Sequence, residues 1–319
     1  PLAGAINGAA GGALGGAPAY VGNGAYCYAN TTSMLLGSVG EAVSPGLIEA
    51  LSGVGMGALW QVEAQLVFFG RGAPDTGVSK ALDLLGFAYE ERSSAADAAM
   101  PLDELRAALE GGPVAIGPVD LGCLTYAQGA RGANGSDHFV LVYGADETEV
   151  QLHDPAGYPH VSLPLADLER AWRAEKVGYR RGAFRHWYAP RRRERVSEEA
   201  LFERAMEWFA SIYRSEAPGR SLAGPEAVRA HAAHVRAGNL GRGQVGHLTG
   251  FAYRLGARRA LDYAAFFGAR RPDLAGLKRR QAVAFGRGHT LAVREEWGAV
   301  SRVAEEIAVI EEELEAALT

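Results

Sequence analysis

The sequence predicts an α+β fold, because its helices and strands are segregated along the chain instead of alternating. Helical patterns come first, a run of strands follows, and a second set of helical patterns completes the sequence. Two apolar runs, 138–143 and 149–153, are joined by a short polar turn, which is typical of an antiparallel hairpin. With 48% apolar and 22% charged residues, the 319-residue chain has the composition of an ordinary globular protein.

The N-terminal elements are expected to be helical. Residues 1–19 are predicted to form a flexible arm rich in Gly and Ala. A helix is predicted to begin at Cys27, after a glycine-rich turn, and to end at Gly37. Further helices are expected over 44–70, 79–85 and 102–109.

Strands are predicted in the middle of the chain, over 113–118, 138–143, 149–153 and 183–188. Pro190 follows the last of them, and the charged run 191–195 then has the composition of a solvated linker. We therefore place a domain boundary at this run, so that a first domain spans 20–195.

The second domain, 196–319, is expected to be entirely α-helical, with helices over 198–213, 225–237, 245–267, 272–285 and 291–318. Within it, the basic belt, residues 229–287, holds 12 basic side chains and only two acidic ones, and eight glutamates follow from Glu295 onward. Three interpretations of the belt remain open: a solvated helical face, a docking surface for an acidic carrier protein, or a nucleic-acid surface, for which no motif is present.

Composition excludes several classes of protein. The first 40 residues carry no charge, but they are mostly small or polar and cannot supply the roughly 20 apolar residues of a membrane span. Two cysteines are too few for a disulfide scaffold or a zinc cluster. His231 and His234 have helical spacing but no evident third ligand. We expect a cytoplasmic protein without membrane association, nucleic-acid partner, metal or cofactor.

Three residues supply the groups that thiol catalysis requires. Cys27 lies at a predicted helix start, where the dipole and the unsatisfied backbone N–H groups favour a thiolate. His138 begins one strand of the predicted hairpin, and Asp154 ends the other, so the hairpin places them side by side. A carboxylate there can orient the imidazole while its other nitrogen faces the sulfur.

Each residue also has an ordinary structural interpretation. A single cysteine in an apolar helix is usually part of the core. His138 can be a surface residue at a strand end, and Asp154 followed by Pro155 is a common start of a turn. The three together, in this order and with this geometry, are more specific than any one of them.

Several segments resemble a known family. The matching residues are Gly24–Cys27, Gly53–Gly57, Asp137–Gly144 and His153–Pro155, and the resemblance covers roughly residues 20–190. They are similar to the N-terminal domain of the butirosin-biosynthesis protein H family, which belongs with the papain-like cysteine enzymes, near the double-glycine leader peptidases. The helical remainder is similar to the partner domain that often follows in such proteins.

The resemblance implies a papain-like cysteine protease fold, with a helical half that carries the cysteine and an antiparallel sheet that carries histidine and aspartate. It also implies an acyltransferase, which moves an aminoacyl group from a carrier-protein thioester to an amine in antibiotic or other natural-product biosynthesis. Cys27 would be the nucleophile, His138 the general base and Asp154 the residue that orients it. Phosphopantetheine would arrive on the carrier protein as part of the donor.

One departure from the papain-like pattern concerns the oxyanion hole. These enzymes usually place a glutamine a few residues before the cysteine, and none is present here. Asn23 can supply a side-chain N–H instead, with the backbone N–H of Cys27 as the second donor. Alternatively, Asn23 is simply a turn residue between two glycines.

The residues leave three functions open. The first is the acyltransferase. The helical domain would either cover the active site or dock a partner, and a covered site would favour transfer over hydrolysis because it keeps water out. The second is a hydrolase, either a peptidase, an amidase or a thioesterase, that uses the same triad. The third is a binding protein on an inactive fold. A homodimer is also conceivable, because the last helix has an apolar stripe that includes Ile307, Ile310 and Leu314.

Overall fold

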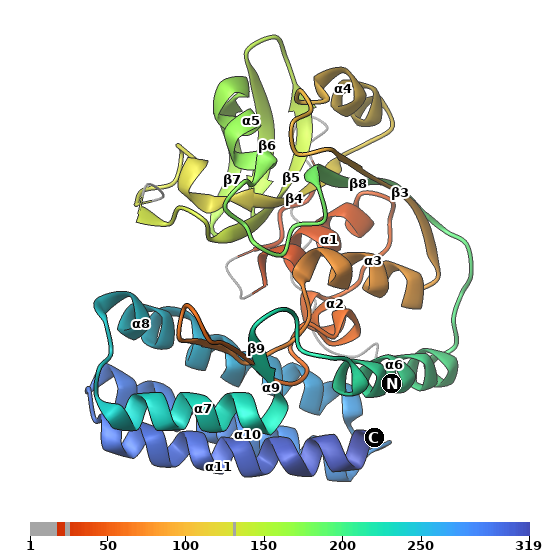
Figure 1. Ribbon diagram of the computed structural model, residues 1–319. Helices are drawn as coiled ribbons and strands as arrows, with labels where there is room; N and C mark the ends of the chain where they lie inside the picture. The colour runs from red at the N-terminus through yellow and green to blue at the C-terminus, as the bar shows by residue number, and fades with distance from the viewer. Residues whose placement is uncertain (1–17, 23–25, 130–131) are drawn as a thin grey trace. The chain divides into compact units, whose positions relative to one another are not determined.

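The computed structural model describes residues 18–22, 26–129 and 132–319 (Figure 1). Packing divides the chain into two units. The sheet unit contains the described residues up to 45 together with 86–194, and the helical unit contains 46–85 together with 195–319. A single domain over 20–195 was expected, whereas the structure groups 46–85 with the C-terminal helices, because its packing partners come after residue 195.

The sheet unit is built on a six-stranded antiparallel sheet with strand order β3-β8-β4-β5-β6-β7. The strands are β3 (Phe87–Ser94), β4 (Val114–Asp120), β5 (Asp137–Ala145), β6 (Glu149–Asp154), β7 (Tyr158–Pro164) and β8 (Ala183–Arg192). Strands β5 and β6 form the predicted hairpin, with Leu141 opposite His153 and Ala145 opposite Val150. The mixed α and β character and the antiparallel sheet are therefore confirmed.

Helices cover both faces of this sheet. On one face, α4 (Leu102–Glu110) and α5 (Leu165–Arg173) bury Leu105, Leu168 and Trp172 against the strands. On the other face, α1 (Cys27–Gly37) packs against β5, where the ring of Tyr28 meets that of Phe139 edge-on at 5.9 Å. The alternation of side chains along β5 explains this division, because Val140 and Phe139 point to opposite faces.

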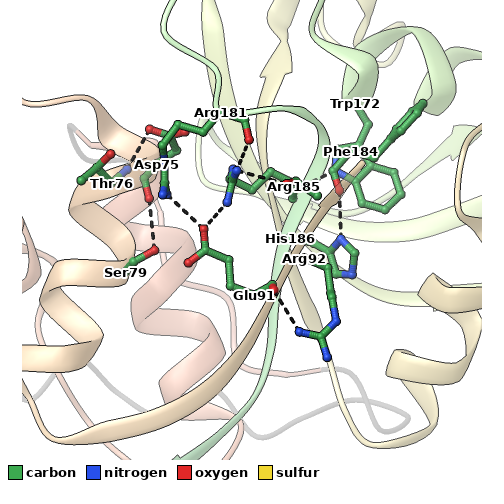
Figure 2. A network of polar contacts seen from close by, with 11 residues as sticks. Asp75, Thr76, Ser79, Glu91, Arg92, Trp172, Arg181, Phe184, Arg185 and His186 are labelled. Carbon is green, nitrogen blue, oxygen red and sulfur yellow. Dashed lines mark hydrogen bonds and ion pairs between the residues drawn. The ribbon is translucent and has the colours of Figure 1, made fainter. Parts of the chain in front are cut away.

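A polar network ties β3 to β8 (Figure 2). Glu91 of β3 accepts a hydrogen bond from Arg181 at 3.0 Å and pairs with Arg185, which is buried in β8. The backbone carbonyl of Arg185 accepts a hydrogen bond from the indole N–H of Trp172 at 2.8 Å. The network therefore joins the edge strand β3 to the core of the unit. Strands β3 and β7 and helix α5 were not predicted from the sequence.

The helical unit consists mainly of α-helices. They are α2 (Pro45–Ser52), α3 (Pro74–Leu84), α6 (Glu198–Arg214), α7 (Gly224–Ala237), α8 (Arg242–His247), α9 (Tyr253–Phe267), α10 (Pro272–Val293) and α11 (Trp297–Leu318). A short π-helix, Leu248–Ala252, lies between α8 and α9. The helical C-terminal region is thus confirmed, although not as an all-α region, because it contributes one strand to a small sheet.

This small sheet corrects the expected helix over 44–70. After α2 the chain forms β1 (Leu59–Gln61) and β2 (Leu66–Phe68), and both belong to a sheet with order β2-β1-β9. The third strand, β9 (Ser221–Ala223), comes from the C-terminal part of the chain. Helix α2 ends at Ser52, and Gly53 follows it with a φ of 72°, a left-handed conformation that glycine adopts without strain.

Four of the twelve basic residues of the basic belt pair with the acidic last helix of the same unit. Arg236 of α7 pairs with Glu305 at 2.7 Å, and Arg280 of α10 pairs with Glu313 at 2.6 Å. Arg229 and Arg287 pair in the same way with two further glutamates of α11. These contacts support the interpretation of the belt as a solvated helical face whose charge is partly neutralised within the chain.

The apolar stripe of α11 is buried within the helical unit. Ile307, Ile310 and Leu314 are at most 1% exposed. These three side chains therefore pack the terminal helix against its own unit. In the part of the chain that the structure describes, no helix combines the length and the apolar character needed to cross a bilayer.

Candidate active site

Cys27 is the first residue of α1, as predicted. The backbone N–H groups of the first helical turn have no partner within the helix, and they favour negative charge at this end. Tyr26, immediately before it, has a left-handed backbone with φ 69°, a conformation that costs a non-glycine residue on the order of 1–3 kcal/mol. The chain therefore turns sharply into the helix, and this turn sets the position of the sulfur.

Side chains of α1 hold this strained turn. The carbonyl of Tyr26 accepts hydrogen bonds from both the backbone N–H and the side-chain amide of Asn30, at 3.0 and 2.8 Å. Ser33 donates to the carbonyl of Val43 at 2.7 Å, which ties the helix to the following chain. Asn30 and Ser33 are both buried, so the helix that carries Cys27 is fixed on several sides.

The hairpin brings His138 and Asp154 into contact. His138 is the second residue of β5, Asp154 is the last of β6, and Nε2 of the imidazole lies 2.6 Å from Oδ1 of the carboxylate. Both side chains are buried. A carboxylate can only accept, so Nε2 carries the hydrogen and Nδ1 is the nitrogen that interacts with Cys27.

Asp154 is held as an anion by three donors. Besides His138, the backbone N–H of Ala156 donates to Oδ1 at 2.7 Å, and the Tyr126 hydroxyl donates to Oδ2 at 2.9 Å. Burial opposes ionisation, but the hydrogen bond and charge of His138, with the other two donors, outweigh it and lower the pKa of Asp154. The residue is therefore a carboxylate at neutral pH.

The charge state of His138 depends on both of its neighbours. Burial favours neutral imidazole, but the charge of Cys27 and hydrogen bonds to Asp154 and Cys27 outweigh burial. Together they raise the pKa of His138 to about 10. The imidazole is therefore held as an imidazolium beside the sulfur of Cys27 and the carboxylate of Asp154. Such an imidazolium can stabilise negative charge on a nearby sulfur and can give a proton to a leaving group.

Cys123 contrasts with Cys27. It ends a single turn of 3-10 helix, Leu121–Cys123, and packs beside the core of the sheet unit. Burial and the nearby charge of Asp120 raise the pKa of Cys123, against opposing effects of Arg170 and Lys176. Since both cysteines are partly exposed and unbridged, Cys123 is an internal reference for the reactivity of Cys27.

Two tyrosines at the site were not found from the sequence. Tyr126 lies in a loop 28 residues before Asp154. The hydroxyl of Tyr20 donates to the backbone carbonyl of Asp154 at 3.1 Å and accepts from the N–H of Gly157 at 3.0 Å. Both reach Asp154 from irregular segments, where no periodic pattern marks them.

The remaining candidate residues lie away from the triad or outside the described residues. Asn23, the predicted oxyanion-hole residue, is outside the described residues, so its role stays a prediction. His153 faces away from the triad, as strand alternation predicted, and its Nε2 lies 2.9 Å from the carbonyl of Pro18. His231 is buried and hydrogen-bonded to the hydroxyl of Tyr253, while His234 is hydrogen-bonded to the side chain of Gln244. Within the described ranges, no three His, Cys, Asp or Glu side chains gather as metal ligands.

Comparison with known proteins finds similarity over nearly the whole chain. A Bacillus subtilis (strain 168) protein described as "Uncharacterized protein YobF" is 39% identical over 294 residues, which cover 92% of this chain and 95% of that protein. The family model of the YobF C-terminal domain matches residues 218–319. That match lies within the helical unit, whereas the triad lies in the sheet unit.

Proposed function

The chain belongs to the YobF family, and we propose that it is a cysteine-dependent acyltransferase that takes an acyl or aminoacyl group from a thioester and passes it to an amine. The observation that carries this proposal is the triad of Cys27, His138 and Asp154 in the sheet unit. A helix that bears the nucleophile against a sheet that bears base and carboxylate also supports a papain-like arrangement.

The proposed reaction has two halves. The Cys27 thiolate attacks the thioester carbonyl, the bond from carbon to the donor sulfur breaks, and the departing thiolate takes the proton of the His138 imidazolium. The amine then attacks the acyl-Cys27 carbonyl, its proton passes to His138, and Cys27 leaves as thiolate. Asp154 holds the imidazole in orientation throughout, and no metal or cofactor takes part in the proposed steps.

The choice of transfer over hydrolysis comes from the resemblance to the butirosin-biosynthesis protein H family. We propose an acyl thioester, free or on a carrier protein, as donor and a small-molecule amine as acceptor, in natural-product biosynthesis. The basic belt adds little to the case for a carrier protein, because several of its arginines already pair with glutamates of α11.

The first test is the reactivity of the thiol. Brief iodoacetamide treatment between pH 5 and 9, followed by intact-protein mass spectrometry, reports the labelling rates of Cys27 and Cys123 when Cys123→Ala and Cys27→Ala variants are compared. We expect Cys27 to label at least about tenfold faster than Cys123 at neutral pH, because only Cys27 has an imidazolium beside it. His138→Ala is expected to abolish the difference.

A second measurement separates the possible reactions. Acyl thioesters are offered with and without amines, and mass spectrometry follows acyl-Cys27 and the released products. Amide product at the expense of free acid supports the transferase. Free acid alone, unaffected by amines, would replace it with a hydrolase. Equal and slow labelling of both cysteines would leave the inactive binding protein as the better interpretation.

A further inference from the structure

We infer that Tyr126 is a positioning residue of this site: its hydroxyl fixes the second oxygen of Asp154, so that the first stays aligned with His138. The inference rests on the proposed function, because it assigns Tyr126 a part in the activation of Cys27. Tyr126 acts through Asp154, since its hydroxyl bonds to the carboxylate.

The two carboxylate oxygens of Asp154 have different partners. Oδ1 lies 2.6 Å from Nε2 of His138 and accepts from the N–H of Ala156 at 2.7 Å. Among the residues that the structure describes, Oδ2 has Tyr126 as its donor, at 2.9 Å. Asp154 is 0% exposed, so solvent does not replace a donor that is lost.

Loss of the Tyr126 hydroxyl would leave this buried anionic oxygen without a hydrogen-bond donor from the described part of the chain. An unsatisfied charged group is expensive in the protein interior, and protonation relieves the cost. A protonated Asp154 no longer stabilises the positive charge of the His138 imidazolium. The imidazolium would then stabilise a thiolate at Cys27 less. Among the described residues, the carboxylate would also be held only through Oδ1, by His138 and the N–H of Ala156.

The environment of Tyr126 keeps it a donor. Burial, and then the charge and hydrogen bond of Asp154, raise the pKa of Tyr126, so the phenol stays protonated. Its ring packs edge-on against that of Tyr158, with centroids 5.7 Å apart. Tyr20 complements it, because the Tyr20 hydroxyl holds the backbone of Asp154 and not its carboxylate.

The variant Tyr126→Phe tests the inference, because it removes the hydroxyl and keeps the ring. We expect iodoacetamide to label Cys27 about tenfold to a hundredfold more slowly at pH 7, as loss of a hydrogen bond to a charged group predicts. The acidic limb of the rate profile is expected to move to higher pH. Tyr158→Phe is the matched control, because it alters the neighbouring ring and keeps the side-chain contacts of Asp154 intact. It should leave the labelling rate of Cys27 and its pH profile unchanged.

A second variant pair separates positioning from structural damage. In an Asp154→Asn background, Tyr126→Phe is expected to slow the labelling of Cys27 much less than it does in the wild type, because the two substitutions act on one contact. Tyr126→His, which restores a ring N–H donor, should recover part of the rate. A folded Tyr126→Phe variant with wild-type rate and profile, or an equal cost in both backgrounds, overturns the inference.

The outcome also distinguishes the inference from the proposed function. If wild-type Cys27 reacts no faster than Cys123, both fail. If Cys27 is fast and depends on His138, but Tyr126→Phe changes nothing, only the positioning role of Tyr126 fails.

Discussion

At the scale of single residues, burial has opposite outcomes in the two units: neighbouring groups outweigh it at His138 and Asp154, whereas it prevails at Lys278. Lys278 of α10 is 1% exposed, and its ammonium group donates to the amide oxygen of Gln281 at 3.0 Å. Gln281 donates in turn to Glu311 at 3.0 Å. Burial lowers the pKa of Lys278 to about 8, although the charge of Glu311 opposes the shift.

This shift predicts how the stability of the helical unit depends on pH. Between pH 8 and 10.5 the unfolded chain binds more protons at this lysine than the folded one, so the free energy of unfolding should rise with pH. The cost of burying the charged ammonium group is on the order of 3 kcal/mol of unfolding free energy, and it is fully present at pH values below the pKa of the folded state. Urea unfolding at pH 7.5 and 9.5 captures about 2 kcal/mol of this cost, and Lys278→Met is expected to flatten this dependence.

Lys80→Met is the control, because Lys80 is only half-buried and contacts the ring of Trp208 at 5.0 Å. If Lys278→Met and the wild type respond to pH alike, the charge of Lys278 is already fully compensated and the prediction is wrong.

The triad could be predicted at residue scale, but its supporting groups could not. Cys27 follows from a helix start, and His138 with Asp154 follows from the ends of one hairpin, so local patterns identify all three. Tyr126 and Tyr20 reach Asp154 from irregular segments, and the bond of Tyr20 spans 134 residues. Such contacts depend on tertiary packing, which no sequence period encodes.

At the scale of elements, glycine was the main source of error. The glycines after α2 do end a helix, although the whole stretch 44–70 was expected to be helical. Gly288, by contrast, lies in the gap expected between helices 272–285 and 291–318, but α10 continues through it to Val293. It is buried, and a Cβ added there would meet the ring of Tyr253 at 2.6 Å, so its small size serves close packing of α10 against α9.

Two alanine substitutions in α10 should therefore have opposite effects. Gly288→Ala is expected to destabilise the helical unit by about 1–3 kcal/mol, because the added methyl group overpacks the contact with Tyr253. Gly286→Ala meets nothing within 4 Å, and it should stabilise the helix by about 0.5–1 kcal/mol. Thermal unfolding of the two variants decides the matter, and equal effects would contradict the packing role of Gly288.

At the scale of the whole molecule, the helical unit is discontinuous in sequence. Buried Arg259 of α9 pairs at 2.8 Å with buried Glu49 of α2, and strand β9 pairs with β1. These contacts join 46–85 to 195–319. The charged run 191–195 marked the end of the sheet unit closely, but a boundary read along the chain cannot reveal a segment that returns to another unit.

We therefore predict that residues 196–319 do not fold on their own as the full chain does. Without 46–85, the helical unit loses the pair of Arg259 with Glu49 and the burial of side chains such as Trp60, Val67 and Phe69, each of which contributes about 1.5–3 kcal/mol. Circular dichroism and thermal melts of the fragment are the measurement, with a second fragment that joins 46–85 to 195–319 through a flexible linker as control. A cooperative transition in the short fragment alone would show that the added segment is dispensable.

The discontinuity also sets an order of events during synthesis. Every residue of the triad and its sheet has been made once the ribosome reaches 194, yet 46–85 must wait for the 125 residues from 195 to 319. At about 5–20 residues per second, that delay is on the order of 6–25 seconds. Throughout it, apolar side chains such as Trp60, Val67 and Phe69, buried in the finished protein, lack their C-terminal partners. The nascent segment between the nucleophile and its base is thus left with unpacked apolar side chains while the second half of its unit is made.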